Sequence, residues 1–185
     1  MVEALHADYW KPVQAGELNF CDTAKVKGLI SNKKSRFFEN AYALQTPMSP
    51  HAAANIDNIQ IDLTSTKRPR TKNNLVIEGA GGLLVPLNEN DCIIDLIQPE
   101  DKIILVSRHY LGSINHTLLS VEALRNRGYK HIGIIFSGEK HPTTESIILS
   151  KTKLKLIGRI PEIKKIDKKA ILIEAKKLSQ NLNEF

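Results

Sequence analysis

The alternation of short apolar runs with segments of helical character constrains the fold of this 185-residue chain more than any other feature. The apolar runs end at turn residues and predict buried strands at 7–13, 75–78, 102–107, 131–136 and 156–160. Helical patterns fill the segments 23–31, 35–44, 51–56, 113–127 and 143–152. Strands that alternate with helices predict an α/β fold with a mostly parallel β-sheet flanked by helices. The length suits one domain over residues 1–185.

The formal net charge is +6, and the excess of positive charge lies near the end of the chain. Residues 151–177 hold ten Lys and Arg side chains against three acidic ones. Apolar residues recur among them at roughly helical spacing, at Ile163, Ile166, Ala170, Ile173 and Leu178. The pattern predicts an amphipathic helix whose lysines face water. We favour this over a nucleic-acid-binding surface because no aromatic residues interleave with the lysines.

Composition excludes several other classes of protein. Apolar residues make up 42% and charged residues 25%, as in a globular protein that is neither disordered nor fibrous. No apolar run approaches the roughly 20 residues that a membrane span needs, so we expect a cytoplasmic protein without a membrane partner. Cys21 and Cys92 form no metal or disulfide pattern.

A glycine-rich turn follows one predicted strand directly. The run Leu75-Val76-Ile77 ends in Glu78-Gly79-Ala80-Gly81-Gly82. A carboxylate at the tip of a strand can bind Mg²⁺, and backbone without side chains can approach phosphate oxygens. A tight turn after a strand is the alternative.

A second strand passes through a polar elbow into a long helix. The elbow and helix start read Ser107-Arg108-His109-Tyr110-Leu111-Gly112-Ser113-Ile114-Asn115-His116. Ser113 is the predicted N-cap, and free N–H groups near Asn115 would suit an anionic ligand such as a carboxylate. Plain capping of the helix is the alternative.

Taken together, several segments resemble dethiobiotin synthetase and occur in the order of that family. The resemblance covers about residues 5–162. Its elements are Tyr9-Trp10-Lys11-Pro12-Val13-Gln14-Ala15-Gly16, Ser49-Pro50-His51, Glu78 to Leu87, Leu111 to His116, and Gly158-Arg159-Ile160-Pro161. In combination they are far more specific than any one of them.

The resemblance implies a P-loop NTPase-like fold and an ATP-dependent cyclo-ligase of biotin biosynthesis. Such an enzyme closes 7,8-diaminononanoate with CO₂ into dethiobiotin and releases ADP and phosphate. An amine of the substrate takes up CO₂ as a carbamate, which attacks the γ-phosphate before the second amine displaces phosphate. Mg²⁺ is the implied cofactor, ATP the co-substrate, and a homodimer the implied assembly.

The resemblance also implies roles for individual residues. Lys11 is the implied catalytic lysine, and Asp22 and Glu78 are the implied ligands of Mg²⁺ and ATP. Residues implied to line the ATP phosphates are Gly79, Ala80 and Gly81. Those implied at the nucleotide base and ribose are Ser137, Gly138, Pro161, Glu162 and Ile163. Those implied to contact the substrate, in part from the other subunit, are Lys11, Ala15, Ser113, Ile114 and Asn115.

The sequence departs from the family pattern in three places. Family members begin with a strand and a Walker A loop, which the 185 residues lack, so we expect a start at an internal methionine and an almost inactive chain. We also expect an unfilled or rearranged sheet position next to the strands at 7–13 and 75–78. Ala15 replaces a common serine, and Ser137 replaces an asparagine that reads adenine. The alternative function is a non-catalytic dimer partner, or a pseudoenzyme, that retains the substrate-binding surfaces.

Overall fold

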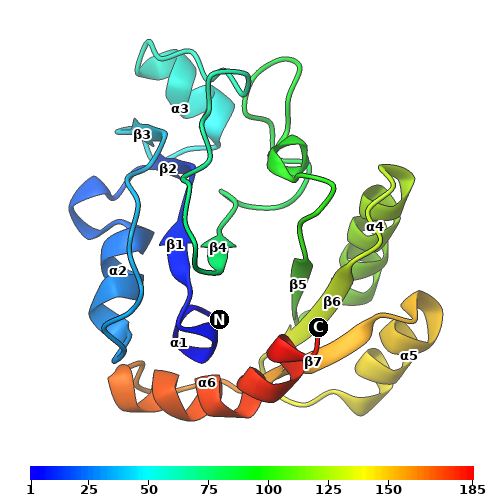
Figure 1. Ribbon diagram of the computed structural model, residues 1–185. Coiled ribbons are helices and arrows are strands. Elements are labelled where there is room, and N and C mark those ends of the chain that lie inside the picture. Colours follow the sequence, from blue (N-terminus) through cyan, green and yellow to red (C-terminus); the bar gives the residue numbers. More distant parts are fainter. The chain divides into compact units, whose positions relative to one another are not determined.

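The computed structural model describes residues 1–185 and divides into two compact units, residues 1–97 and 98–185. Both units combine helices with parallel strand pairs, which confirms the predicted α/β class (Figure 1). The expectation of one domain over the whole chain stays a prediction. No helix has the length and apolar character needed to cross a membrane.

The first unit contains four strands in two parallel pairs. β1 (Asp8–Trp10) pairs with β4 (Leu75–Ile77), and β2 (Val13–Ala15) pairs with β3 (Tyr42–Leu44). Its helices are α1 (Val2–Leu5), α2 (Asp22–Leu29), α3 (Pro50–Ile56) and the 3₁₀ turns η1 (Leu18–Phe20) and η2 (Ile93–Leu96). The one strand predicted at 7–13 is therefore two strands. Pro12 lies at the break because it has no N–H to donate to a ladder.

The helix predicted at 35–44 was wrong, because this segment is extended and runs beside β1 and β2. Tyr9 donates its backbone N–H to the Arg36 carbonyl (2.9 Å), and Phe38 donates to the Tyr9 carbonyl (3.0 Å). Farther along, Gly16 donates to the Leu44 carbonyl (2.9 Å). These long-range hydrogen bonds outweigh the local helical pattern.

Buried apolar side chains hold the first unit together in two clusters. One cluster lies around β2, β3 and α3 and consists of Val13, Leu44, Ala53, Ala54, Ile61, Leu87 and Ile93. The other packs Tyr9 of β1 against Val2 and Ile30. β4 has β1 as its one strand partner, so no strand of this chain occupies the position on its other edge.

The second unit is a three-stranded parallel sheet in the order β5 (Ile103–Arg108), β6 (Ile132–Ser137), β7 (Lys155–Ile160). Its helices are α4 (Ser113–Asn126), α5 (Pro142–Thr152) and α6 (Lys168–Asn183). β6 is the central strand and its Ile134 and Phe136 pack with Ile148 of α5. These elements match the predicted strands and helices of this region closely.

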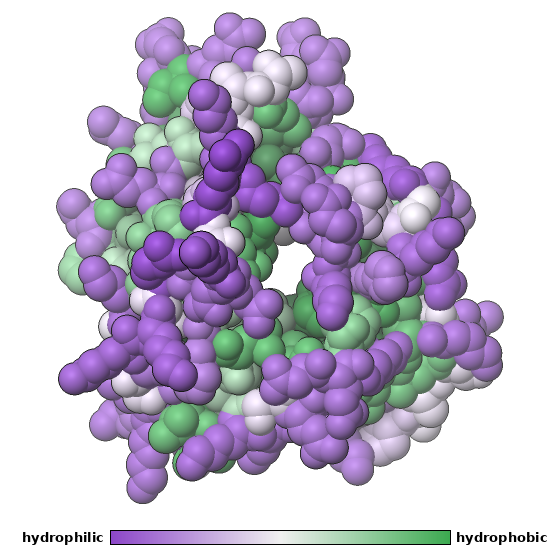
Figure 2. Space-filling view, viewed as in Figure 1, coloured by the Kyte–Doolittle hydropathy of each residue, from purple (hydrophilic) through white to green (hydrophobic).

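The basic tail forms the predicted amphipathic helix, but α6 begins only at Lys168, so Ile163 and Ile166 precede it. Leu178 packs on β7 so closely that a Cβ on Gly158 would lie 2.4 Å from its Cδ2 atom. The lysines of this region are exposed, at Lys164, Lys165, Lys168, Lys169, Lys176 and Lys177. Hydrophilic side chains also cover most of the face drawn in Figure 2.

Candidate active site

The register of β1 and β4 brings Lys11 next to Glu78. Tyr9 pairs with Val76 and Trp10 with Ile77, and the Glu78 N–H donates to the Trp10 carbonyl (3.0 Å). Lys11 and Glu78 are therefore the next pair, at the carboxyl ends of two parallel strands. This end of a parallel sheet is where open α/β folds bind ligands.

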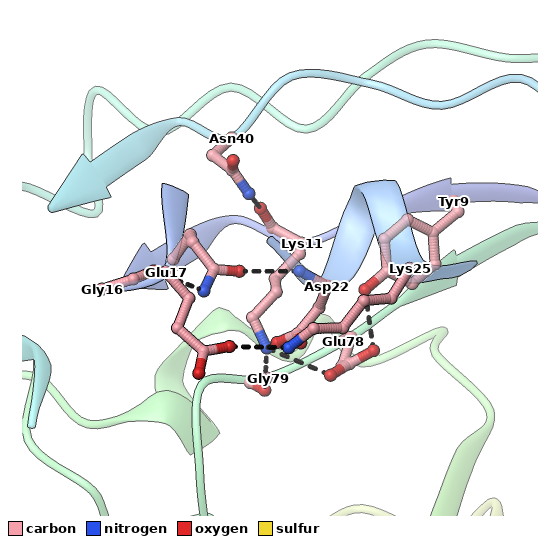
Figure 3. A network of polar contacts seen from close by, with 10 residues as sticks. Tyr9, Lys11, Gly16, Glu17, Asp22, Lys25, Asn40, Glu78 and Gly79 are labelled. Atoms are coloured by element: carbon pink, nitrogen blue, oxygen red, sulfur yellow. Dashed lines mark hydrogen bonds and ion pairs between the residues drawn. The ribbon is translucent and has the colours of Figure 1, made fainter. Parts of the chain in front are cut away.

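Lys11 is the centre of a charged cluster that we call the Lys11 cluster, formed by Lys11, Asp22 and Glu78. Its Nζ atom lies 2.8 Å from Asp22 Oδ2, 3.0 Å from Glu78 Oε1 and 3.5 Å from the Gly79 carbonyl oxygen (Figure 3). Only 7% of the Lys11 side chain is exposed, against 34% for Asp22 and 44% for Glu78. The lysine is thus buried while both carboxylates can be reached from solvent.

Lys11 and Asp22 of the Lys11 cluster stay charged at neutral pH. Burial by itself lowers the pKa of Lys11, but the hydrogen bond to Asp22 and the charge of Glu78 outweigh it and raise that pKa. Burial likewise raises the pKa of Asp22, and the hydrogen bond and charge of Lys11 outweigh it, so the pKa of Asp22 is lowered. The site therefore presents an ammonium group beside the ionised carboxylate of Asp22.

Four further side chains support this cluster, and the sequence analysis identified none of them as site residues. Lys25 bonds Glu17 (2.7 Å) and lies 3.5 Å from Asp22 Oδ1. The Gln14 side chain accepts from the Asp22 N–H (3.4 Å), and Asn40 donates to the Lys11 carbonyl (2.6 Å). Lys25 lies three residues after Asp22 on α2, a spacing that could have indicated this contact.

Tyr9 is a fifth such residue. Its hydroxyl donates to Glu78 Oε2 at 2.7 Å, and burial together with this hydrogen bond and the Glu78 charge raises the pKa of Tyr9. The hydroxyl therefore stays protonated and acts as a donor. The position of Tyr9 two residues before Lys11, on the same face of an extended segment, is a signal that the sequence carried.

The glycine-rich segment after Glu78 has structural reasons for two of its glycines. A Cβ on Gly79 would lie 2.8 Å from Ile93 Cγ2, and Gly81 has φ +90°, a region that L side chains rarely adopt. Gly82 has open space around it. The tight-turn explanation thus accounts for Gly79 and Gly81, and the phosphate-lining role of Gly79, Ala80 and Gly81 stays a prediction.

The predicted substrate residues fall in both units. Ala15 ends β2 and is half-buried. In the second unit Gly112, with φ +103°, is the N-cap of α4, so the prediction of Ser113 as N-cap was wrong: Ser113 is the first helical residue and is buried. Only a residue that tolerates positive φ fits the cap position here. Ile114 and Asn115 follow on the exposed side of this turn.

The elbow before α4 borders a cleft of about 350 Å³ in the second unit. Its lining residues are His109, Tyr110, Leu111, Gly112, Ser113, Ile114, His141 and Thr144. The His109 ring stacks on Phe136 and its Nε2 atom lies 3.0 Å from Glu145 Oε1, which also pairs with Arg159. Burial and the charge of Arg159 lower the pKa of His109. This contact could not be predicted from the sequence, because residues 109, 145 and 159 lie on separate elements.

The predicted nucleotide residues of the second unit partly come together. Gly138, with φ +106°, follows β6 and donates its N–H to the Ile160 carbonyl (3.0 Å). A Cβ on Gly138 would lie 3.8 Å from Glu162 Oε1, so these two residues are close neighbours beside Ser137. Pro161 is exposed and Ile163 half-buried on the segment after β7.

Parallel strands with charged side chains at their carboxyl ends are typical of α/β proteins that bind a ligand at this edge of the sheet, and residues 1–170 match a protein family described as an AAA domain. Relatives share the sequence over nearly its full length. A protein of Christiangramia forsetii is 59% identical over 185 residues, which are 100% of this chain and 89% of the relative. One of Cytophaga hutchinsonii is 44% identical over 186 residues, 100% of this chain and 90% of the relative.

A third relative, from Rhodopseudomonas palustris, is 42% identical over 182 residues, 98% of this chain and 87% of that protein. All three carry the name ATP-dependent dethiobiotin synthetase BioD. The chain therefore belongs to the dethiobiotin synthetase family, a family of ATP-dependent ligases.

Proposed function

We propose that this chain catalyses the ATP-dependent closure of 7,8-diaminononanoate with CO₂ to dethiobiotin, with release of ADP and phosphate. The observation that carries the proposal is Lys11, buried between Asp22 and Glu78 at the carboxyl ends of two parallel strands. The names of the relatives support ATP as co-substrate and biotin biosynthesis as the pathway.

Lys11 has the properties that the phosphoryl-transfer step requires. A substrate carbamate oxygen attacks the γ-phosphate, and negative charge accumulates on the phosphate oxygens. A fixed ammonium group beside these oxygens stabilises that charge, which is the main contribution of enzymes to phosphoryl transfer. Because Asp22 and Glu78 raise the pKa of Lys11, the side chain carries its positive charge before the reactants bind. It exchanges its carboxylate partners for substrate oxygens when ATP and the carbamate bind.

The carboxylates of the Lys11 cluster fit Mg²⁺. Asp22 and Glu78 offer hard oxygen donors that both lie next to Lys11 Nζ. Each carboxylate is partly open to solvent. The chain has no group of three or more His, Cys, Asp or Glu side chains arranged to hold a metal. Two protein carboxylates with phosphate and water oxygens are, however, a common set of ligands for Mg²⁺. When bound, Mg²⁺ neutralises charge on the phosphates of ATP.

The other predicted residues would bind the base and ribose of ATP and the carboxylate of diaminononanoate. Ser137, Gly138, Pro161, Glu162 and Ile163 would contact the base and ribose, supported by the proximity of Gly138 to Glu162. Ser113, Ile114 and Asn115 would receive the substrate carboxylate at the start of α4, where backbone N–H groups lack helical partners. In a homodimer this helix start would serve the site of the other subunit.

The test is a coupled measurement of ATP hydrolysis and dethiobiotin formation. The chain is assayed alone and with an added N-terminal strand and Walker A loop of the kind with which family members begin. We expect one ADP for each dethiobiotin, and no ADP when diaminononanoate or CO₂ is left out. Binding of diaminononanoate without turnover would contradict the proposal and favour the non-catalytic dimer partner.

A further inference from the structure

The two oxygens of Glu78 have different partners. Oε1 faces Lys11 Nζ at 3.0 Å, and Oε2 accepts from the Tyr9 hydroxyl at 2.7 Å. Successive side chains of a strand point to opposite faces of the sheet, so Tyr9 and Lys11 lie on the same face. Val76 and Glu78, which lie opposite them on the neighbouring segment, share that face. Tyr9 therefore reaches Glu78 diagonally across the β1–β4 pair, a distance that long aromatic side chains span.

The Tyr9 ring is held in place on all sides. The residue is 1% exposed and packs against Val2 and Ile30, and its ring centroid lies 5.9 Å from that of Phe37. Its backbone N–H and carbonyl are both bonded to the segment 36–38. A ring fixed in this way presents its hydroxyl at one point, so the donor is pre-organised.

Apart from its ion pair with Lys11, Glu78 is not held by surrounding side chains as the Tyr9 ring is. Its side chain is 44% exposed and it follows the last residue of β4, where the ladder ends. Without a donor on Oε2, the carboxylate could rotate about its side-chain bonds into solvent. The Tyr9 hydroxyl therefore selects the orientation in which Glu78 Oε1 faces Lys11 Nζ, the atom that Asp22 also contacts.

We propose that Tyr9 is a positioning residue that holds the Glu78 carboxylate in the orientation required for binding a divalent cation together with Asp22. This inference rests on the proposed function, in which Glu78 is a metal ligand. Tyr9 itself touches neither metal nor substrate in this account. Its effect passes entirely through Glu78.

The experiment measures binding of Mn²⁺ alone to the isotopically labelled 185-residue chain, from the broadening of NMR signals of Asp22 and Glu78. The variants are Tyr9→Phe, Glu78→Gln and the double variant. Tyr42→Phe is the matched control, because the Tyr42 hydroxyl is also bonded within the first unit, to the Asp62 backbone. Thermal unfolding of each variant reports any loss of structure.

Loss of one hydrogen bond to a charged group should raise the half-saturating Mn²⁺ concentration of Tyr9→Phe by about 10- to 100-fold. Tyr42→Phe should bind as the unaltered chain does. In the Glu78→Gln background the Tyr9 substitution should have no further effect, since Tyr9 acts only through the Glu78 carboxylate.

The outcomes separate the two proposals. Normal Mn²⁺ binding by Tyr9→Phe with weakened binding by Glu78→Gln would overturn the role of Tyr9 and leave the metal site intact. Normal binding by Glu78→Gln, or no binding by the unaltered chain, would overturn both. An additional loss from Tyr9→Phe in the Glu78→Gln background would also overturn the positioning role.

Discussion

Replacement of Asp8 by asparagine is expected to destabilise the first unit by about 2.5 kcal/mol at neutral pH and by much less at pH 2. Asp8 is fully buried in β1 and accepts hydrogen bonds from the Arg36 N–H (2.9 Å), Thr71 Oγ1 (2.7 Å) and Asn73 Nδ2 (3.2 Å). Arg36 also forms an ion pair with it (3.0 Å). Asp8 thereby connects the segments that carry Arg36 and residues 71–73 to β1.

The magnitude follows from the pKa of Asp8. Burial alone raises this pKa, but the hydrogen bonds from Arg36, Thr71 and Asn73 outweigh it and lower it from 3.8 to about 2. At about 1.4 kcal/mol for each pH unit, the difference corresponds to about 2.5 kcal/mol. A lowered carboxyl pKa stabilises the fold above pH 3.8, and this contribution is lost as the pH falls toward 2.

The assay is urea unfolding of the unaltered chain and of Asp8→Asn at pH 7 and pH 2. Glu89→Gln is the control, because it removes the same charge from an exposed side chain. The free energy of unfolding should differ strongly between Asp8→Asn and the unaltered chain at pH 7 only. An equal loss at both pH values, or a loss no larger than that of Glu89→Gln, would refute the reasoning.

Four other substitutions test the candidate site and the loop beside it. With the upstream segment present, Lys11→Ala should lower turnover by at least about 10²- to 10³-fold and leave the circular dichroism spectrum unchanged, because a single positioned donor contributes this much; near-normal turnover would contradict its role. Asp22→Asn and Glu78→Gln should each raise the Mg²⁺ concentration needed for half-maximal rate, since a neutral oxygen is a poorer ligand; unchanged Mg²⁺ titrations would leave only the tight-turn explanation. Gly79→Ala should cost roughly 1–3 kcal/mol of stability because its Cβ would lie 2.8 Å from Ile93 Cγ2; unaltered chemical denaturation would show that the loop relaxes freely.

The second unit was the more predictable half of the fold. Its strands are bounded by turn residues, α4 and α5 lie between consecutive strands, and α6 follows the last strand, so local pattern and final structure agree. In the first unit the segment 35–44 has a helical pattern but pairs with residues 9–16 through backbone hydrogen bonds. Such pairing depends on contacts about 30 residues apart, which the local sequence does not encode.

The three members of the Lys11 cluster could be predicted from the sequence, but only some of the contacts that hold them could. The resemblance predicts Lys11, Asp22 and Glu78, and the structure places one carboxylate oxygen of Asp22 and one of Glu78 within 3.0 Å of Lys11 Nζ. The supporting contacts of Tyr9 and Lys25 were missed, since they follow from strand register and from the helix that carries Asp22. Spacing along a chain indicates which residues share a face but not which strand lies opposite.

The change of ladder partner at Pro12 has a consequence for amide hydrogen exchange. β1 is bonded to β4, whereas β2 is bonded to β3, and the two pairs are connected by Lys11 and Pro12 and by the extended segment 36–41, whose first residues are bonded to Tyr9. β2 and β3 can therefore open together while the β1–β4 pair beneath Lys11 and Glu78 remains closed. The amide of Gly16, which donates to the Leu44 carbonyl, should then exchange with deuterium independently of the amide of Trp10, and Lys11 would lie at the boundary between two cooperative opening units.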